Sequence, residues 1–337
     1  MTIQVTKEPI NLREKLNELE TNKGLKGNEI LQAETAQEVR SLIGAGRKNL
    51  IINGGFDVWQ RGTSFTSLNG YGADRWKCWV SNVSKAQELL PNGDTANVLV
   101  STGDATNIHH ITQAIENGVN NLSGKTVTVS CYAKASVGFT ANFARLRGYT
   151  TGGGTTHTTG SAAVTTSWTK FSFTYTFGNI TADALSNYMM LYIFADIPNN
   201  INVSVAQVQL ELGSVATDFE HRSYGEELAL CQRYYQKHIS GDLYTGFGYT
   251  HKDRIYGYRY IKPMRIPPTL SYSALGHFSI RNVNNTVIGT PTAITHSRPG
   301  SQFTNLQFTH ASIVSTSAYH IVANGTSNAW IAFDAEL

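Results

Sequence analysis

Short segments of alternating apolar and polar residues, separated by loops rich in glycine, asparagine and serine, constrain the fold of this chain most. The alternation is regular in Thr126-Val-Thr-Val-Ser-Cys-Tyr-Ala133 and in Phe171-Ser-Phe-Thr-Tyr-Thr-Phe177. Because side chains alternate across a β-strand, this pattern predicts strands with one buried face. The predicted strands are Ala96–Ser101, His110–Ile115, Thr126–Lys134, Ala141–Gly148, Thr169–Phe177, Tyr188–Ala195 and Asn202–Leu212. Residues 49–222 are therefore expected to form an antiparallel jelly-roll β-sandwich, with 152–167 as a long exposed loop.

A second β region is predicted over residues 240–337, as a C-terminal β-sandwich domain. The strand Ile255–Ile261 places Tyr256, Tyr258 and Tyr260 on one face, with Arg259 nearby. This row is a candidate surface for glycan contact or for a subunit interface, where tyrosine is also enriched. Further strands are expected at Thr269–Ser273, His277–Asn282, Asn305–Thr309, Ala318–Ala323 and Ala329–Glu336.

The two β regions are joined by a predicted linker helix at residues 223–239. Gly213 ends the preceding strand, whose two faces are expected to alternate without interruption. The motif Ser223-Tyr-Gly-Glu226 has the spacing of a capping box at a helix start. Leu228, Cys231 and Tyr235 would then recur on one helical face.

The first 48 residues predict a helical anchor or adaptor rather than a globular domain. Leu12, Leu16 and Leu19 form a single apolar stripe on a short helix. Helices shorter than about 12–15 residues are marginal in water, so this one must dock on a partner. Self-association and docking on a larger assembly both remain open. A second capping box, Thr35-Ala-Gln-Glu38, precedes another short helix.

Composition excludes several classes of function. Charged residues make up only 15% of the chain and the formal net charge of +3 is spread along it, which argues against a nucleic-acid partner. No apolar run is long enough to insert in a membrane. The start of the sequence has no signal-peptide pattern, so folding in a reducing cytoplasm is expected, with export by cell lysis open. The three cysteines form no CxxC pair and are expected to be buried free thiols.

No pattern in the sequence indicates catalysis. Glu211 and Glu220 bracket one turn, but they are not accompanied by a GxSxG or HExxH motif. His109-His110 has no third metal ligand at a telling spacing. Asp74–Arg75 is interpreted as a structural ion pair or turn, and Glu226 and Glu227 as charges that complement the helix dipole. The chain is therefore predicted not to be an enzyme and to carry no cofactor.

A structural calcium ion is the one metal considered, because jelly rolls of this kind can hold such an ion with carboxylates and backbone carbonyls. Asp57, Asp74 and Asp218 are candidate donors, although their spacing does not single them out.

Four tryptophans lie in strand-like contexts of the predicted jelly roll. They are Trp59, Trp76, Trp79 and Trp168. An exposed indole could stack on a sugar ring, whereas a buried indole contributes a large apolar area to the core. Core packing is the favoured interpretation for each.

Three motifs occur in a recognisable order. They are Asn49-Leu-Ile-Ile-Asn-Gly-Gly-Phe-Asp-Val-Trp-Gln-Arg-Gly62, Ala73-Asp-Arg-Trp76 and Gln209-Leu-Glu-Leu-Gly-Ser-Val-Ala-Thr-Asp-Phe-Glu220. Together with Glu227-Leu-Ala-Leu-Cys-Gln-Arg-Tyr-Tyr235 and the terminal Asp334-Ala-Glu-Leu337, they resemble a family of phage and prophage tail-fibre or virion appendage proteins. The core domain of that family looks like the jelly roll of carbohydrate-binding modules.

The resemblance implies a part of a virion that is assembled in the host cytoplasm. It implies a homotrimer, anchored by its N-terminus to other phage tail or capsid proteins, which presents β domains to host cell-surface glycans as a tail fibre or receptor-binding appendage. Two alternatives stay open. One is a purely structural head fibre, capsid decoration or tail adaptor, and the other is an enzyme that degrades surface polysaccharide.

Overall fold

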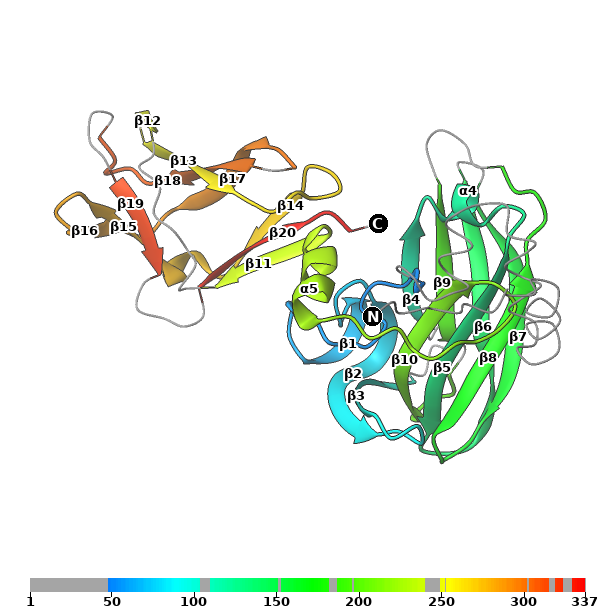
Figure 1. Cartoon of the computed structure of the whole chain (residues 1–337). Helices are drawn as coiled ribbons and strands as arrows, with labels where there is room; N and C mark the ends of the chain where they lie inside the picture. The colour runs from blue at the N-terminus through cyan, green and yellow to red at the C-terminus, as the bar shows by residue number, and fades with distance from the viewer. Residues whose placement is uncertain are drawn as a thin grey trace, which may run out of the picture.

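The computed structural model describes residues 48–103, 110–150, 153–181, 187–195, 197–239, 249–251, 253–301, 303–314, 319–323 and 329–336. The predicted N-terminal anchor, with Leu12, Leu16 and Leu19, therefore lies outside the described residues apart from Lys48. Figure 1 shows two β-rich bodies connected by a short helix. The prediction of a mainly β chain is confirmed.

The larger body is a jelly-roll β-sandwich built from ten antiparallel strands. Its strands are β1 (Ser64–Tyr71), β2 (Lys77–Leu89), β3 (Thr95–Thr102), β4 (His110–Glu116), β5 (Thr126–Ala135), β6 (Phe139–Thr150), β7 (Gly153–Val164), β8 (Thr169–Thr176), β9 (Tyr188–Ala195) and β10 (Asn202–Leu212), with the short helix α4 (Gly118–Leu122) after β4. They pair in the order β7-β6-β9-β4-β2-β3-β10-β5-β8, and β1 pairs with β2. The sheet curls at β2, so that the β6–β9–β4 layer faces the β10–β5–β8 layer.

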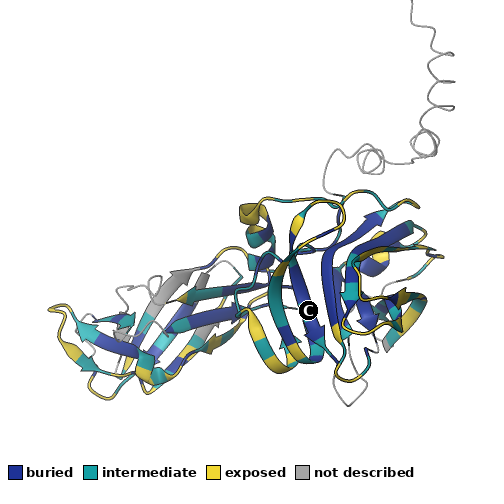
Figure 2. Ribbon diagram, turned by 90° about the horizontal axis from the view of Figure 1, so that it is seen from below, coloured by how far each residue is buried: buried dark blue, intermediate teal, exposed yellow. Residues whose placement is uncertain are grey.

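Aromatic rings from both layers meet in the core of the sandwich. The ring centroid of Phe171 in β8 lies 5.6 Å from that of Phe143 in β6 and 6.0 Å from that of Phe194 in β9. These rings belong to one continuous apolar cluster, which also includes the fully buried Trp76. Figure 2 shows that buried residues lie in several strands of both bodies.

Residues 152–167 do not form the predicted exposed loop. Gly153–Val164 is strand β7, which pairs with β6 over most of its length. The threonines of this segment are β-branched and suit an edge strand better than a loop. Gly160 packs against the ring of Phe173, where a Cβ atom would lie 2.5 Å from the ring. Glycine here marks a close approach between layers, not a flexible turn.

The alternation of β10 is interrupted by a β-bulge. Gln207 has φ of 52°, and the pairing register with β5 shifts between Ala206 and Gln209. Before the bulge, the core residues of β10 are Val203 and Val205. After the bulge, they are Val208 and Leu210. The predicted uninterrupted assignment of faces was wrong, because one extra residue moves the following side chains to the other face.

The smaller body is made of three short sheets around one apolar core. Its strands are β11 (Tyr235–Ile239), β12 (Tyr249–His251), β13 (Arg254–Tyr260), β14 (Thr269–Tyr272), β15 (Phe278–Asn282), β16 (Val287–Gly289), β17 (Ala293–Pro299), β18 (Phe303–Thr309), β19 (Tyr319–Ala323) and β20 (Trp330–Asp334), with a 3-10 turn η2 (Leu275–His277) before β15. The sheet orders are β11-β20-β14, β12-β13-β18-β17 and β16-β15-β19. Phe278 and Phe333 are fully buried in the shared core.

Helix α5 (Tyr224–Gln232) connects the two bodies and ends earlier than predicted. The predicted capping box is confirmed: Ser223 Oγ accepts a hydrogen bond from the Glu226 amide, and the Glu226 carboxylate accepts one from the Ser223 amide. Residues 235–239 form β11 instead of helix. Tyr235 pairs with Asp334 there, so the strand partner outweighs the helical spacing of the apolar residues.

Glu227 lies in the first turn of α5, where a charge complementing the helix dipole was predicted, and it also contacts the jelly roll. Its side chain is buried and accepts a hydrogen bond of 2.6 Å from the Asn53 amide. It also lies 3.4 Å from Arg222, whose guanidinium donates to the carbonyl oxygen of Ile51 at 3.0 Å. The helix is thereby fixed to the N-terminal segment of the jelly roll.

Two arginines fasten the C-terminal body to the jelly roll. Arg75, 1% exposed, pairs with the Glu336 carboxylate and donates to the Ala114 carbonyl oxygen at 2.6 Å. Its guanidinium carbon lies 3.6 Å from the ring centroid of Tyr234. The guanidinium carbon of Arg61 likewise lies 3.5 Å from the ring centroid of Tyr235. We call Arg61, Arg75, Tyr234, Tyr235 and Glu336 the joint.

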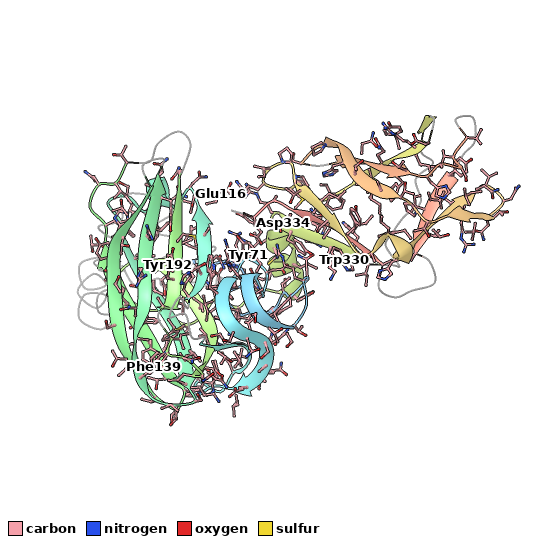
Figure 3. The ribbon with its side chains drawn as sticks, turned by 180° about the vertical axis from the view of Figure 1, so that it is seen from behind. Tyr71, Glu116, Phe139, Tyr192, Trp330 and Asp334 are labelled. Atoms are coloured by element: carbon pink, nitrogen blue, oxygen red, sulfur yellow. The ribbon has the colours of Figure 1, made fainter. Side chains whose placement is uncertain are left out.

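Further carboxylates complete the joint. Arg61 lies 3.7 Å from Asp74, 3.2 Å from Asp334 and 3.4 Å from Glu336. Asp74 also accepts a hydrogen bond of 3.0 Å from the Gln60 amide. Asp74 and Arg75 thus occupy one turn as predicted, but each pairs with a residue other than its neighbour. Figure 3 shows Tyr71, Glu116 and Asp334 close to the place where the bodies meet.

Candidate functional site

A strip of aromatic side chains crosses the outer side of the β2–β4–β9–β6 layer. Strand register places Trp79 of β2 opposite His110 of β4, and Tyr149 of β6 opposite Tyr188 of β9. Tyr192 of β9 lies between these two pairs. We call Trp79, His110, Tyr149, Tyr188 and Tyr192 the aromatic face; Figure 3 shows the position of Tyr192 on the sheet.

The alternation of each strand directs these rings away from the core. In β9, Met189, Leu191 and Ile193 belong to the core cluster, so Tyr188 and Tyr192 point to the opposite side. The same argument applies to β4, where Ile111 and Ile115 are in the core and His110 faces outward, and to β6, where Leu146 is in the core and Tyr149 faces outward. The rings are half-buried by one another, apart from Tyr192, which is 7% exposed.

The rings contact one another in a continuous series. Ring centroids lie 4.5 Å apart for Trp79 and His110, and 5.2 Å apart for His110 and Tyr192. The hydroxyl oxygens of Tyr192 and Tyr149 lie 3.0 Å apart, and the Tyr149 ring stacks on Tyr188 at 4.9 Å. Mutual contact holds the rings in place, so a ligand would meet a preorganised surface.

Positive charges border the aromatic face. The Lys77 ammonium lies 4.5 Å from the ring centroid of Trp79, and the Arg147 guanidinium carbon lies 5.0 Å from that of Tyr149. Arg145 lies 5.8 Å from the ring of Tyr192. These distances are within the range of cation–π attraction. Arg147 also donates a hydrogen bond of 3.1 Å to the Gly154 carbonyl oxygen, which fixes its direction.

The hydroxyls of Tyr188 and Tyr192 remain protonated at neutral pH. Burial, and after it the hydrogen bond with Tyr149, raise the pKa of Tyr192 to about 12. Burial also raises the pKa of Tyr188. The face therefore offers flat apolar rings, hydroxyl groups that donate and accept, and cationic donors at its border. Such a surface can bind a polyhydroxylated chain by stacking and hydrogen bonding.

The four tryptophans divide into two kinds. Trp76 is fully buried, Trp59 packs against the jelly-roll core, and Trp168 donates to Glu88 at 3.1 Å within a small satellite cluster. Core packing is confirmed for Trp76. Trp79 differs, because it lies half-buried on the outer side of its strand and stacks on His110.

The predicted tyrosine row lies in β13 of the C-terminal body. Tyr256 is half-buried and pairs with Tyr249 in β12. Tyr258, Tyr260 and Arg259 belong to the same strand, but their side chains lie outside the described ones. Their role in glycan or subunit contact stays a prediction.

The candidate catalytic and metal-binding carboxylates do not converge. Glu211 accepts hydrogen bonds from Thr217, and Glu220 accepts one of 2.7 Å from the Asn49 amide, so both fasten the segment after β10. Asp57 accepts from Asn97, Asp74 belongs to the surroundings of the joint, and Asp218 lies elsewhere. Within the described part of the chain, His, Cys, Asp and Glu side chains form no group of three or more that could hold a metal ion. Asp57, Asp74 and Asp218, the candidate calcium donors, therefore do not belong to one such group.

The cysteines match their prediction: Cys78, Cys131 and Cys231 are buried free thiols. Burial raises the pKa of the Cys78 thiol to about 12. None of the described helices is both long and apolar enough to cross a lipid bilayer.

Sequence reasoning missed most of the aromatic face. Tyr149, Tyr188, Tyr192 and His110 all lie in or beside strands that were predicted, at positions opposite the apolar set. Aromatic residues on the polar side of several strands could have indicated a surface strip. The order of the strands in the sheet, which brings those positions together, was not visible in the sequence.

Comparison with known proteins supports a carbohydrate-binding fold for part of the chain. Residues 48–191 match the sequence profile of a family described as "Carbohydrate binding domain". This range is less than half of the chain and contains every residue of the aromatic face except Tyr192. A search of curated proteins found no matching sequence.

Similar solved structures include the CBM22-1 xylan-binding domain from Paenibacillus barcinonensis Xyn10C, at 15% identity and a TM-score of 0.32, covering 45% of this chain and 94% of that one. The CBM22-1-CBM22-2 tandem domain of the same protein has 12% identity and a TM-score of 0.32, covering 81% of this chain and 95% of that one. The enzymatically active domain of tailspike protein 4 from bacteriophage CBA120 has 13% identity and a TM-score of 0.32, covering 49% of this chain and 21% of that one. TM-scores below 0.5 support no inference about this chain. What stands is that residues 48–191 match a carbohydrate-binding family and that strands β1–β10 form a jelly-roll β-sandwich.

Proposed function

We propose that this chain is a non-enzymatic, glycan-binding appendage of a phage virion, a tail fibre or receptor-binding protein whose aromatic face binds host surface polysaccharide. The aromatic face is the observation that carries the glycan-binding part. It combines rings, hydroxyl groups and bordering cations, and all of its residues except Tyr192 lie in the range that matches a carbohydrate-binding family. The virion part is supported by the sequence resemblance of the motifs around Asn49, Asp74 and Gln209 to tail-fibre proteins.

An extended ligand suits the geometry better than a small one. The face runs across four strands, from Trp79 in β2 to Tyr149 in β6, and neighbouring strands in a sheet lie about 4.8 Å apart. Rings at both ends can therefore contact successive residues of a glycan chain. A homotrimer would present three such faces together, which raises the effective affinity without new contacts.

Binding should be measured by affinity electrophoresis and calorimetry with capsular and lipopolysaccharide preparations from candidate hosts. Trp79→Ala and Tyr188→Ala should each weaken binding by about tenfold or more, because aromatic anchors dominate interface energies. Tyr224→Ala removes a 59% exposed tyrosine from α5 and serves as the matched control that leaves binding unchanged. Equal binding by all three variants, or release of shortened oligosaccharides by the wild-type chain, would contradict the proposal.

The virion part has its own test. Antibody labelling of purified phage particles and adsorption of the isolated protein to host cells should both be positive. A mass measurement in solution should give three times the chain mass. Labelled particles without any cell adsorption would instead identify a structural head fibre, decoration or adaptor.

A further inference from the structure

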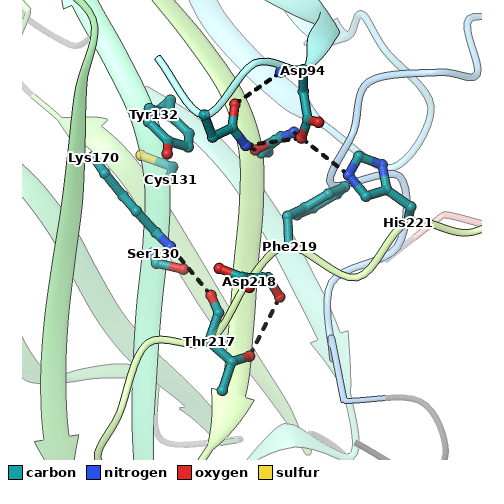
Figure 4. A pocket seen from close by; sticks show the side chains of 11 residues that line it. Asp94, Ser130, Cys131, Tyr132, Lys170, Thr217, Asp218, Phe219 and His221 are labelled. Carbon is teal, nitrogen blue, oxygen red and sulfur yellow. Dashed lines mark hydrogen bonds and ion pairs between the residues drawn. The ribbon is translucent and has the colours of Figure 1, made fainter. Parts of the chain in front are cut away.

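A pocket with a volume of 350 Å³ lies on the opposite layer of the jelly roll from the aromatic face. Its floor is β5, where Tyr132 faces outward because Cys131 and Ala133 belong to the core. Its walls are Lys170 of β8, the loop between β2 and β3, and the segment 213–222 that follows β10. Figure 4 shows these walls around Tyr132 and Phe219.

The segment 213–222 is held firmly against the sheet. Thr128 Oγ1 donates to the Gly213 carbonyl oxygen at 2.8 Å, and Thr174 Oγ1 donates to that of Ser214 at 3.2 Å. The Glu220 amide donates to Gln209 at 2.9 Å. The pocket is therefore a fixed feature of the surface, since its outer wall is hydrogen-bonded at both ends.

The bulge in β10 aims a side chain at the opposite wall. Gln207, in its left-handed conformation, donates to Asp94 Oδ2 at 2.6 Å. Asn92 and His221 approach the same oxygen at 2.8 and 3.3 Å. These contacts, the one from Gln207 first, lower the pKa of Asp94 and fix its carboxylate. Bulges commonly redirect a side chain next to a site, and left-handed backbone costs on the order of 1 kcal/mol or more for residues other than glycine.

Other polar groups in the pocket have unused capacity. Among the described residues none donates a hydrogen bond to the Asp218 carboxylate, and none bonds the Tyr132 hydroxyl. Burial raises the pKa of Tyr132, as do the charges of Asp94 and Asp218, so this hydroxyl remains a donor. Lys170 makes one hydrogen bond, of 3.3 Å to the Thr217 carbonyl oxygen, and an ammonium can make three.

We propose that this pocket is a second carbohydrate site, which takes a single neutral sugar residue. Sugar hydroxyls would donate to Asp218 and accept from Lys170 and Tyr132, while the ring carbons contact Phe219. Two carboxylates face one ammonium, so an anionic sugar is disfavoured. The volume lies at the lower end of ligand pockets, which span about 300–1,000 Å³, and suits a sugar end better than a chain.

The inference goes beyond the binding proposed for the aromatic face and does not depend on it. The aromatic face is an open strip bordered by cations, whereas the pocket is concave and carries a carboxylate to which none of the described residues donates a hydrogen bond. The two sites lie on opposite layers of one domain, so each can be removed without touching the other. A protein with both could contact two parts of a glycan coat at once.

Saturation-transfer NMR on the full chain tests the pocket. The probes are the methyl glycosides of glucose, galactose and mannose, with glucosamine and galacturonate as charged counterparts. At least one neutral glycoside should receive saturation from the wild-type protein. Asp218→Ala should weaken that binding by about tenfold or more, and Tyr132→Phe by about threefold, since each removes one hydrogen-bonding group.

Two matched variants separate the sites. Asp253→Asn changes an exposed aspartate of the C-terminal body and should leave the signal unchanged. Trp79→Ala should also leave it unchanged, while weakening polysaccharide binding by the aromatic face about tenfold or more. The proposal is overturned if no neutral glycoside binds, if a charged counterpart binds more tightly, if Asp218→Ala has no effect, or if Trp79→Ala removes the signal.

Discussion

An arginine beside a tyrosine ring occurs in two regions of this molecule, and the two regions use it differently. In the joint, Arg75 lies on Tyr234 and its charge is met by Glu336 from the C-terminal body. On the aromatic face, Arg147 lies beside Tyr149, and none of the described residues forms an ion pair with it. The same pair of groups closes an interface in one place and leaves an anion-attracting surface in the other.

The comparison shows what separates a structural contact from a binding surface in this fold. The guanidinium of Arg75 is 1% exposed and needs the Glu336 carboxylate, because an unpaired buried charge is costly. Arg147 is half-exposed and keeps contact with water, so it needs no partner from the chain. A ligand that carries a carboxylate could therefore supply the counter-charge for Arg147.

Glu336→Ala should have the largest effect. It leaves Arg75 buried without its counter-charge, which costs roughly 3–5 kcal/mol when one partner of a buried pair is removed. Chemical denaturation should show that loss, and limited proteolysis should show cleavage between the two bodies. In the double variant Arg75→Met, Glu336→Leu, most of the stability should return. Wild-type stability of the single variant would mean that the joint does not hold the bodies together.

Alkaline pH should destabilise the joint. Burial raises the pKa of Tyr235 from 10.0 to about 12. This stability is fully present below pH 10 and is lost as the pH rises towards 12, because the unfolded tyrosine ionises first. The difference corresponds to roughly 2–3 kcal/mol. Tyr235→Phe keeps the ring under Arg61 and should flatten the dependence of the melting temperature on pH between 9.5 and 11.5. If the melting temperature of Tyr235→Phe depends on pH as steeply as that of the wild type, Tyr235 is not the source of this pH dependence.

Ser223→Ala should destabilise the connection by a smaller amount. It removes the side chain that caps α5, a change that costs about 1 kcal/mol. Because α5 carries Glu227 to the Asn53 amide, the loss should appear as a lower melting temperature for the whole chain. Ser223→Asp keeps an N-cap acceptor and should restore stability. If Ser223→Ala and Ser223→Asp have the same melting temperature, the N-cap of α5 does not limit the stability of the chain.

Arg147→Gln should have the smallest effect and should be specific to charge. Binding of polygalacturonate should weaken by about two- to fivefold, since a half-exposed ion pair contributes roughly 0.2–1 kcal/mol. Binding of a neutral mannan should not change. The matched control is Arg254→Gln, an exposed arginine of the C-terminal body. Equal loss for both polysaccharides would mean that Arg147 only supports the shape of the face.

The sequence predicted most strands but not how they are ordered. Alternation is a local property, so segments such as Thr126–Lys134 and Tyr188–Ala195 were placed within a residue or two. The same logic failed at Gln207, where one bulged residue changes the phase, and over Gly153–Val164, where glycine and threonine resemble a loop. A period of two carries no information about either exception.

The candidate site was harder to predict than the fold. Trp79 was considered but assigned to the core, because its own strand gives no sign that His110 and Tyr192 lie beside it. The motif at Asp74–Arg75 was located correctly, yet its partner Glu336 could not be deduced from spacing. Contacts between distant segments depend on sheet order and on the docking of the second body, and neither leaves a local pattern.

The pairing of Arg75 with Glu336 joins residues that are 261 positions apart. At a synthesis rate of about 5–20 residues per second, the ribosome needs on the order of tens of seconds to make the second after the first. During that interval the nascent jelly roll must keep an arginine that its own domain cannot neutralise. A chain whose translation stops before Glu336 would therefore contain Arg75 without its carboxylate partner. Chaperones and proteases could recognise such a product by this unpaired positive charge.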